Sequence, residues 1–267
     1  MHQEEYIDEI LRRCDFQDCK PVTTPAIKSP ELSKGGSPPT KLIGSGYSIL
    51  SIVGALGWLA RNSRPDINYA WAKAAQYVAD PDTDTQWRRL GRILRYLKST
   101  KRLGVLWRRG ASDRLFGYTD ADWGGTEHGK SQTGWIYFLA GAPLLWASVR
   151  QRCVALSTAQ AEIIAFTQGL KNGMGLTNLL TEIKECVPRP LTVKIDNQAA
   201  IKLGETSIFA KGLRHVNLSF AFINDEVKKG AVKMEFVPSA EQLADILTKP
   251  LKRDQHRLLT AQLLQQL

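Results

Sequence analysis

Cysteine and histidine are scarce in this chain of 267 residues, which carries four of each. The cysteines stand at positions 14, 19, 153 and 186, without the close pairing that zinc sites and disulfide frameworks use. We therefore expect neither kind of site, and we expect reduced thiols in a reducing compartment.

Long hydrophobic runs are also absent, although 43% of the residues are hydrophobic. No run approaches the roughly 20 apolar residues that a membrane helix needs. The N-terminal MHQEE is too polar for a secretory signal. The composition predicts a soluble, intracellular protein of one or two domains, located in the cytoplasm and without a membrane partner.

Acidic residues are missing from the segment 88–109, which holds nine of the basic residues behind the net charge of +10. Leucine and isoleucine recur there at helical spacing, which predicts an amphipathic helix with Arg88, Arg92 and Arg95 on its exposed side. Such a stripe is either a solvated helix face or a surface that follows a phosphate backbone.

The order of elements predicts a mixed α/β fold. Residues 21–46 are rich in proline and glycine and indicate a linker. Helical patterns cover 4–13, 47–60, 67–78 and 84–99. Alternating β-rich runs then predict antiparallel strands at 103–108, 115–120, 133–139 and 144–148. A long helix, with a capping box at Ser157 and Gln160, precedes further strands at 191–195 and 231–237. Helices are expected up to residue 203, at 216–228 and from Ser239, with Gln242 three residues after that cap.

Four acidic residues are each predicted to lie at the end of a strand or near the start of a helix: Asp120, Glu162, Asp196 and Asp245. Carboxylates that converge at one sheet edge repel one another, so their convergence favours a hard divalent cation among them. On a basic chain, this pattern indicates a metal-dependent nuclease.

The residues around these acids resemble the ribonuclease H domain of copia-type retrotransposon polyproteins. The matching segments are VALSTAQAE (154–162), IDNQAA (195–200) and QLADILTKP (242–250). Upstream, DCKPVTTP (18–25) resembles the end of that family's reverse transcriptase. Three further stretches resemble the segment that joins the reverse transcriptase to the nuclease in that family: 47–58, SRPDI (63–67) and RILRYLK (92–98).

The resemblance implies a ribonuclease H-like mixed sheet flanked by helices and preceded by a small helical region. It divides the chain into the end of the reverse transcriptase with a linker (1–46), a helical connection region (47–102), the ribonuclease H-like domain (103–250) and a C-terminal helical tail (251–267). No Asp-Asp dipeptide occurs, so a polymerase site is not expected.

The resemblance also implies roles for individual residues. Asp120 would bridge two Mg²⁺ ions, Glu162 and Asp196 would complete their coordination, and Asp245 would hold the second ion more loosely. Mn²⁺ is an expected substitute. His215 is a candidate for proton transfer or product release, and a surface histidine is the competing interpretation. Asn197 would contact nucleic acid, and beside such a nuclease the stripe of Arg88, Arg92 and Arg95 is expected to bind nucleic acid as well. The expected partners are an RNA–DNA hybrid and the remaining reverse transcriptase domain, in the cytoplasm or in retrotransposon particles.

Several alternatives remain open from the sequence. Asp122 is a rival to Asp120, because residues two apart on a strand share a face. Trp123, Trp135 and Trp146 are expected in the core, although tryptophans also stack on bases.

The chain also departs from the family pattern. Gln160 replaces an acid, Asn217 and Ala221 replace an aspartate and a histidine, and glycines at 169, 173 and 175 interrupt the long helix. Such departures would suit a decayed copy that acts as a nucleic-acid-binding or assembly module. An integrase is disfavoured, because no His-His-Cys-Cys module is present.

Overall fold

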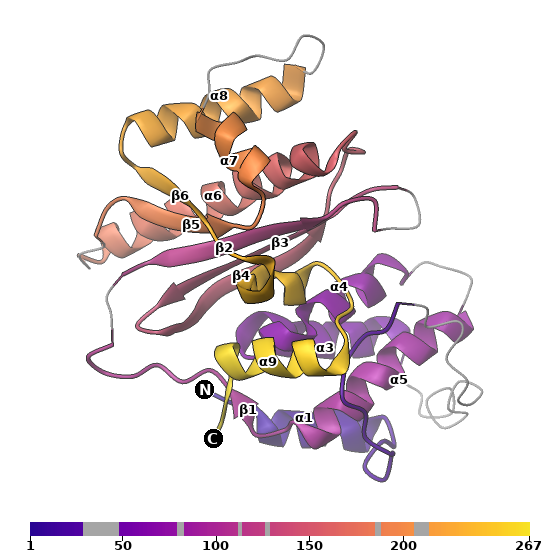
Figure 1. The fold of residues 1–267 in the computed structure, drawn as a ribbon. Helices are drawn as coiled ribbons and strands as arrows, with labels where there is room; N and C mark the ends of the chain where they lie inside the picture. The colour runs from indigo at the N-terminus through magenta and orange to yellow at the C-terminus, as the bar shows by residue number, and fades with distance from the viewer. Residues whose placement is uncertain (29–47, 79–82, 112–113, 126–128, 185–187, 206–213) are drawn as a thin grey trace. The chain divides into compact units, whose positions relative to one another are not determined.

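The computed structural model describes residues 1–28, 48–78, 83–111, 114–125, 129–184, 188–205 and 214–267 (Figure 1). Most of the predicted linker therefore lies outside the described residues. The chain divides into two compact units, one of residues 1–106 with 250–267 and one of residues 107–249. Within the described residues, no helix is long and apolar enough to cross a membrane.

The first unit is built mainly from helices, and the four helical patterns predicted in this part of the sequence are confirmed. The α-helices are α1 (Glu4–Arg13), α3 (Ile49–Asn62), α4 (Asn68–Gln76), α5 (Thr83–Ser99) and α9 (Arg253–Leu263), with a 3₁₀ turn, η2 (Pro65–Ile67), before α4. Their apolar faces form one core that includes Leu11, Leu56 and Leu90. Burying these faces stabilises helices that would be marginal alone.

A buried ion pair lies within this unit. Arg64 donates to both carboxylate oxygens of Asp66, at 2.9 and 2.7 Å, and Tyr96 Oη donates to the same carboxylate at 2.7 Å. His256 of α9 places Nε2 3.3 Å from the carbonyl oxygen of Asp66. The C-terminal helix is therefore joined to η2 and α5 through a network that water does not reach.

The strand expected at 103–108 is shorter than predicted and belongs to a different sheet. Only β1 (Leu103–Gly104) forms, and it pairs antiparallel with β7 (Gln265–Gln266) at the C-terminus. The prediction of a strand in the main meander was wrong here. Two-residue strands carry no periodic pattern, and their pairing depends on where the distant C-terminus packs.

The predicted exposure of the arginine stripe on α5 was also wrong. Arg88, Arg92 and Arg95 are half-buried. Arg92 donates to Thr24 Oγ1 at 2.8 Å, and Arg95 donates to the carbonyl of Lys20 at 2.7 Å. The segment after α1 thus lies along this face of the helix and uses some of its hydrogen-bond donors.

The second unit contains a five-stranded mixed sheet, as predicted. Its strands are β2 (Phe116–Asp122), β3 (Gln132–Leu139), β4 (Ala142–Arg150), β5 (Leu191–Ile195) and β6 (Val232–Phe236), in the spatial order β4-β3-β2-β5-β6. β2, β3 and β4 pair antiparallel, whereas β5 runs parallel to both β2 and β6. The carboxyl ends of β2 and β5 therefore meet at one edge.

Three helices, α6 (Thr158–Glu182), α7 (Gln198–Glu205) and α8 (Arg214–Lys228), belong to this unit, and α6 packs against β2 and β3. The predicted N-cap is present, because Ser157 Oγ accepts the Gln160 amide hydrogen, and the Gln160 side chain accepts from the amide of Leu156, one residue before the cap. Gln160 thus caps the helix as an acid at that position would.

Two glycines that the sequence marks as helix-weakening allow α6 to lie close to the sheet. A Cβ on Gly169 would lie 2.5 Å from Thr119 Cγ2, and one on Gly173 would lie 2.5 Å from the Tyr137 ring. Tyr137 Oη also donates to the carbonyl of Gly169 at 2.7 Å. Gly175 has open space around it, so among the three glycines of α6 it is the one that a larger residue could replace without a clash.

The helix predicted from Ser239 is replaced by two short 3₁₀ segments, η3 (Ser239–Glu241) and η4 (Leu243–Leu247). Gln242 separates them in an extended conformation, and its buried side chain donates to the carbonyl of Thr119 on β2 at 3.0 Å. This contact with the sheet holds the chain in a shape that a continuous α-helix does not allow.

Candidate metal centre

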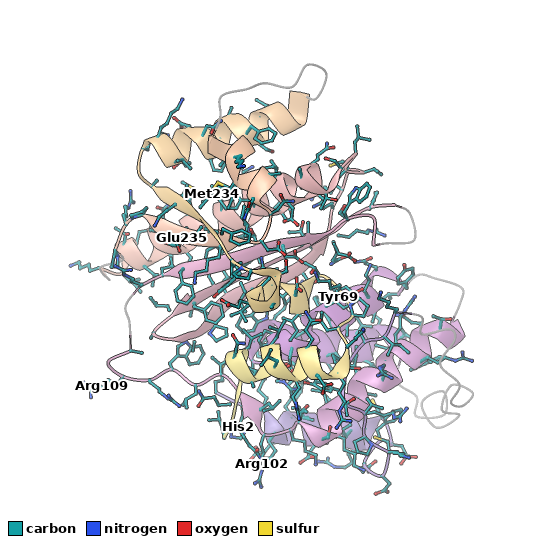
Figure 2. The ribbon with its side chains drawn as sticks, in the orientation of Figure 1. His2, Tyr69, Arg102, Arg109, Met234 and Glu235 are labelled. Carbon is teal, nitrogen blue, oxygen red and sulfur yellow. The ribbon has the colours of Figure 1, made fainter. Side chains whose placement is uncertain are left out.

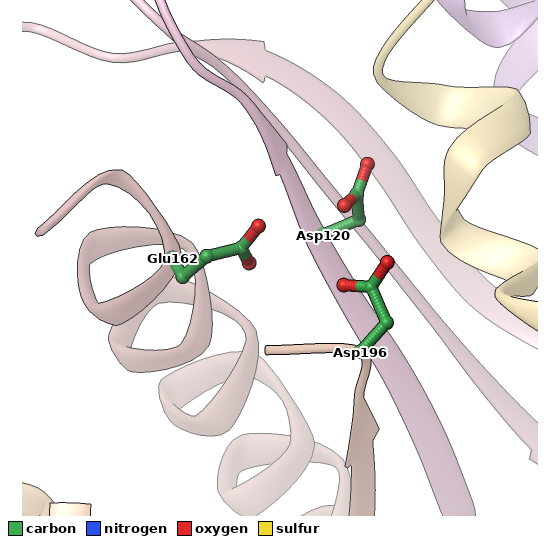
Figure 3. A group of neighbouring side chains, drawn as sticks. All are labelled: Asp120, Glu162 and Asp196. Atoms are coloured by element: carbon green, nitrogen blue, oxygen red, sulfur yellow. The ribbon is translucent and has the colours of Figure 1, made fainter. Parts of the chain in front are cut away.

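Three of the four predicted acids converge in the second unit (Figure 3). Asp120 lies on β2, Asp196 directly follows β5, and Glu162 lies near the start of α6. Each offers a carboxylate oxygen, and these atoms all lie within 4.8 Å of one another. The parallel pairing of β2 with β5 and the close packing of α6 produce this arrangement.

Two carboxylates of this trio are strongly desolvated, and that of Asp196 is half-buried. Asp120 is 2% exposed and Glu162 is 4% exposed. Burial, and then the charges of Asp120 and Asp196, raise the pKa of Glu162 to about 9. Burial also raises the pKa of Asp120, against the opposing effects of Lys249 and Thr248. Glu162 therefore stays protonated at neutral pH unless a cation compensates the charge of its neighbours.

The donor set fits a hard divalent cation. Oε2 of Glu162 is buried and has no hydrogen-bond partner in the described part of the chain, and such an atom is costly unless something binds it. Clustered carboxylate oxygens are the ligands that hard divalent ions prefer. A divalent cation would also favour ionisation of the acids that burial keeps protonated.

Asp245, the fourth predicted acid, lies on η4 and pairs with Lys249. The Lys249 ammonium is 2.7 Å from Asp245 Oδ1 and 3.7 Å from Asp120 Oδ2. Burial, and then the charge of Asp120, raise the pKa of Asp245 to about 7. The four predicted acids therefore lie near one another, with a lysine between two of them.

Lys249, Thr248 and Ser239 were not among the predicted site residues. Thr248 Oγ1 donates to Asp120 Oδ2, and Ser239 Oγ donates to Asp196 Oδ2 at 2.8 Å. These contacts orient the two aspartates. The sequence held two signals: Thr248 and Lys249 lie in the family-like segment 242–250, and Asp245 and Lys249 have the four-residue spacing that is also typical of ordinary helical ion pairs.

The rival acid, Asp122, is not part of the trio. It lies at the end of β2 with its carboxylate against Gly125, where an added Cβ would collide with it. Trp123 is 49% exposed, so its expected place in the core was wrong, whereas Trp135 and Trp146 are buried as expected. The Trp123 indole nitrogen donates to the carbonyl of Ala155 at 2.9 Å, which fixes the ring beside the loop before α6.

Among the remaining predicted residues whose side chains the structure describes, Asn197 does not join the trio. Asn197 Oδ1 accepts the Ala200 amide hydrogen at 3.0 Å, so it caps α7. The side chains of His215 and Asn217, on α8, lie outside the described residues. Arg88, Arg92 and Arg95 belong to the first unit.

Curated proteins similar to this chain are retrotransposon polyproteins. It is 35% identical over 254 residues, or 95% of its length, to the retrovirus-related Pol polyprotein from transposon RE2 of Arabidopsis thaliana. It is 34% identical over 269 residues to that from transposon TNT 1-94 of Nicotiana tabacum. The matched regions make up 17% and 20% of those polyproteins, so this chain spans about a fifth of their length or less.

No family model matches the chain. Among solved structures, the LC11-RNase H1 isolated from compost aligns with 51% of this chain and 94% of its own, with 16% sequence identity and a TM-score of 0.40.

Proposed function

This chain belongs, over nearly its whole length, with the Pol polyproteins of copia-type retrotransposons, and from that premise we propose that its second unit is a ribonuclease H. The proposed reaction is metal-dependent endonucleolytic hydrolysis of the RNA strand of an RNA–DNA hybrid during reverse transcription. One observation carries the proposal: three carboxylates, two of them buried and one half-buried, present oxygen atoms within 4.8 Å of one another from β2, from the end of β5 and from α6.

In this proposal the carboxylates have distinct positions around the reaction centre. Asp120, Glu162 and Asp196 would hold two Mg²⁺ ions, with Asp245 as a further ligand and Mn²⁺ as a substitute. When bound, such ions lower the pKa of water and neutralise charge on a phosphate that is being cleaved. Thr248 and Ser239 fix the rotamers of Asp120 and Asp196 through their hydroxyl hydrogen bonds. Two carboxylates are thereby pre-oriented before substrate arrives.

Lys249 would complete the charge balance of the site. Its ammonium lies beside Asp245 and near Asp120, and the two carboxylates raise its pKa despite burial. The lysine therefore stays protonated at neutral pH. A permanent cation at this place would compensate part of the acidic charge and would attract a phosphate.

A non-catalytic role as a decayed module receives less support. None of the four predicted acids is replaced in the sequence, and the departure at Gln160 leaves the helix cap intact. The arginine stripe that such a module would use is half-buried and partly bonded to Lys20 and Thr24. Association with the remaining reverse transcriptase domain, and location in the cytoplasm or in retrotransposon particles, belong to the same proposal.

A panel of labelled substrates tests this function. The purified chain is incubated with RNA–DNA hybrid, single-stranded RNA, duplex RNA and duplex DNA, each with Mg²⁺ and with chelator. We expect cleavage of the RNA strand of the hybrid in Mg²⁺ and none with chelator. Equal cleavage of all RNA substrates, or cleavage that survives chelation, would contradict the proposal.

A further inference from the structure

A second concave region of the sheet unit lies away from the carboxylate trio. It is a pocket of about 390 Å³ at the beginning of β2 and β5, bordered by β6 and by residues 188–190. Its charged lining consists of four cations and one carboxylate: Arg114, Arg189, Lys194, Lys233 and Glu235. We call this region the basic pocket.

The strand register places the basic pocket on the sheet face that α6 does not cover. Lys194 of β5 pairs with Tyr118 of β2 and with Glu235 of β6, and residues paired across strands share a face. Met234 and Glu235, labelled in Figure 2, are neighbours on β6 and point to opposite faces. Because Met234 is in the core with α6, Glu235 and Lys194 lie on the other side.

The charges of the basic pocket favour an anion. Lys233 lies 2.7 Å from Glu235, so the pocket's carboxylate is already balanced by one lysine. The Lys194 ammonium lies 5.6 Å from the ring centroid of Phe116 and 5.3 Å from that of Tyr118, over the aromatic side chains of β2. These rings hold the lysine in place without neutralising it. Arg114 and Arg189, both exposed, add two further positive charges at the rim.

The basic pocket and the carboxylate trio lie on one strand. Phe116, Tyr118 and Asp120 alternate on the same face of β2, which has a regular register throughout. Four residues of strand span about 13 Å. One strand of a duplex rises about 3.4 Å per nucleotide along the axis, and its phosphates also wind around that axis, so the distance corresponds to a few nucleotides at most.

We propose that the basic pocket binds a phosphate of the nucleic-acid strand, a few nucleotides from the phosphate held at the carboxylate trio. The distance to the trio rests on the proposed ribonuclease function, whereas anion binding at the pocket does not. A polymer is favoured over a mononucleotide because pocket and trio share a face and lie a few phosphates apart. The pocket would therefore set which bond of a long hybrid is cut and would add affinity, while the acids perform the chemistry.

Binding and cleavage are tested separately on the full chain. Binding of an 18-base-pair RNA–DNA hybrid is measured by fluorescence anisotropy in chelator, across a salt series. The variants are Arg114→Gln with Lys194→Gln, and Arg114→Gln with Lys233→Gln, which leaves Lys194 on its aromatic rings. Lys228→Gln, an exposed lysine on α8, is the matched control. Thermal denaturation of each variant verifies folding.

We expect each double variant to weaken hybrid binding about tenfold at low salt and to lower the log–log salt slope by roughly 0.9, the value for the one phosphate that the pocket contacts. The control should bind like wild type. In Mg²⁺, cleavage at saturating hybrid should persist, with the cut positions spread more widely. An unchanged salt slope in both folded double variants would overturn the proposal.

Adenosine 5′-monophosphate provides the arm that separates a polymer from a small nucleotide. If millimolar nucleotide binds wild type but not the variants, while hybrid binding stays unchanged, the pocket is a mononucleotide site and the proposal is wrong. If wild type binds hybrid through the pocket yet cleaves nothing in Mg²⁺, the ribonuclease function fails and the phosphate site stands.

Discussion

The ammonium nitrogen of Lys249 lies 2.7 Å from Oδ1 of Asp245 and also faces Asp120, 3.7 Å away. Asp245 lies in η4, and Lys249 lies two residues after the end of η4. The 3₁₀ turn brings the lysine over the aspartate, which is nearly buried. A single cation thus offsets part of the repulsion between two acids of the candidate metal centre.

Replacing Lys249 by Met should therefore make the protein without metal less stable. The side chain is about one-third exposed, so we expect a loss of about 1–2 kcal/mol in the free energy of unfolding, between the values for exposed and buried pairs. Mg²⁺ should restore more stability to this variant than to wild type. Urea unfolding with chelator and with millimolar Mg²⁺ measures both effects, and equal unfolding in chelator would contradict the charge-balancing role.

Asp120 and Asp122 should differ in their effect on cleavage, although both lie on one face of β2. Asp120→Asn removes a carboxylate from the trio, and Asp122→Asn changes one that lies against Gly125. We expect cleavage of hybrid to fall on the order of 10³-fold for the first and less than about tenfold for the second. Initial rates at saturating hybrid provide the comparison. Equal losses of cleavage rate in the two variants would mean that the geometry of the trio does not distinguish the metal ligand Asp120 from Asp122.

The three glycines of α6 should respond differently to alanine. At Gly175 the added methyl meets open space, so Gly175→Ala should stabilise the protein by about 0.5–1 kcal/mol. Gly169→Ala would push a methyl into Thr119, and Gly173→Ala would push one into Tyr137, so each should cost about 1–3 kcal/mol. Urea unfolding of the three variants tests this, and three equal shifts would show that helix propensity alone decides.

Stability of the helical unit should fall as the pH drops below about 6.5. Burial lowers the pKa of His256, partly offset by Asp66. Above the unfolded pKa of about 6.5 the ring is neutral in both states; below it the unfolded chain binds the proton more readily, so stability declines. The loss between pH 7.5 and 5.5 should be at most about 1.4 kcal/mol from this residue.

His256→Gln provides the control for that pH dependence. The lowered pKa of Asp66, which Arg64 maintains against burial, contributes only below about pH 4 and stays in both proteins. Urea unfolding at the two pH values should show a smaller decline for the variant. If the free energy of unfolding declined equally in wild type and variant, a group other than His256 would be responsible for the pH dependence.

Much of this fold follows from patterns that can be read locally. The helices of the first unit and the strands β2, β3 and β5 have apolar periodicities long enough to show their type, and Ser157 with Gln160 marks the start of α6. Asp120 and Asp196 could be placed at one edge because each ends a strand run. These features depend on interactions between residues close in sequence, so they can be predicted from the sequence alone.

The remaining features depend on contacts between distant segments. The cover over the α5 arginines comes from Lys20 and Thr24, about 70 residues earlier, in a segment without periodicity. Gly169 and Gly173 weaken an isolated helix, and only the proximity of the sheet shows why they are needed. The split of η3 and η4 likewise depends on one hydrogen bond from Gln242 to β2.

In the proposed function, Asp120 on β2, Asp196 after β5 and Glu162 on α6 are the groups at which RNA in a hybrid is cleaved. Single-turnover cleavage of an RNA–DNA hybrid in Mg²⁺ by wild type, Glu162→Gln and Asp196→Asn tests it most directly, with circular dichroism verifying that each variant is folded. We predict cleavage of the RNA strand by wild type and a loss on the order of 10³-fold in both variants. Hybrid cleavage at wild-type rates by either folded variant would contradict the account.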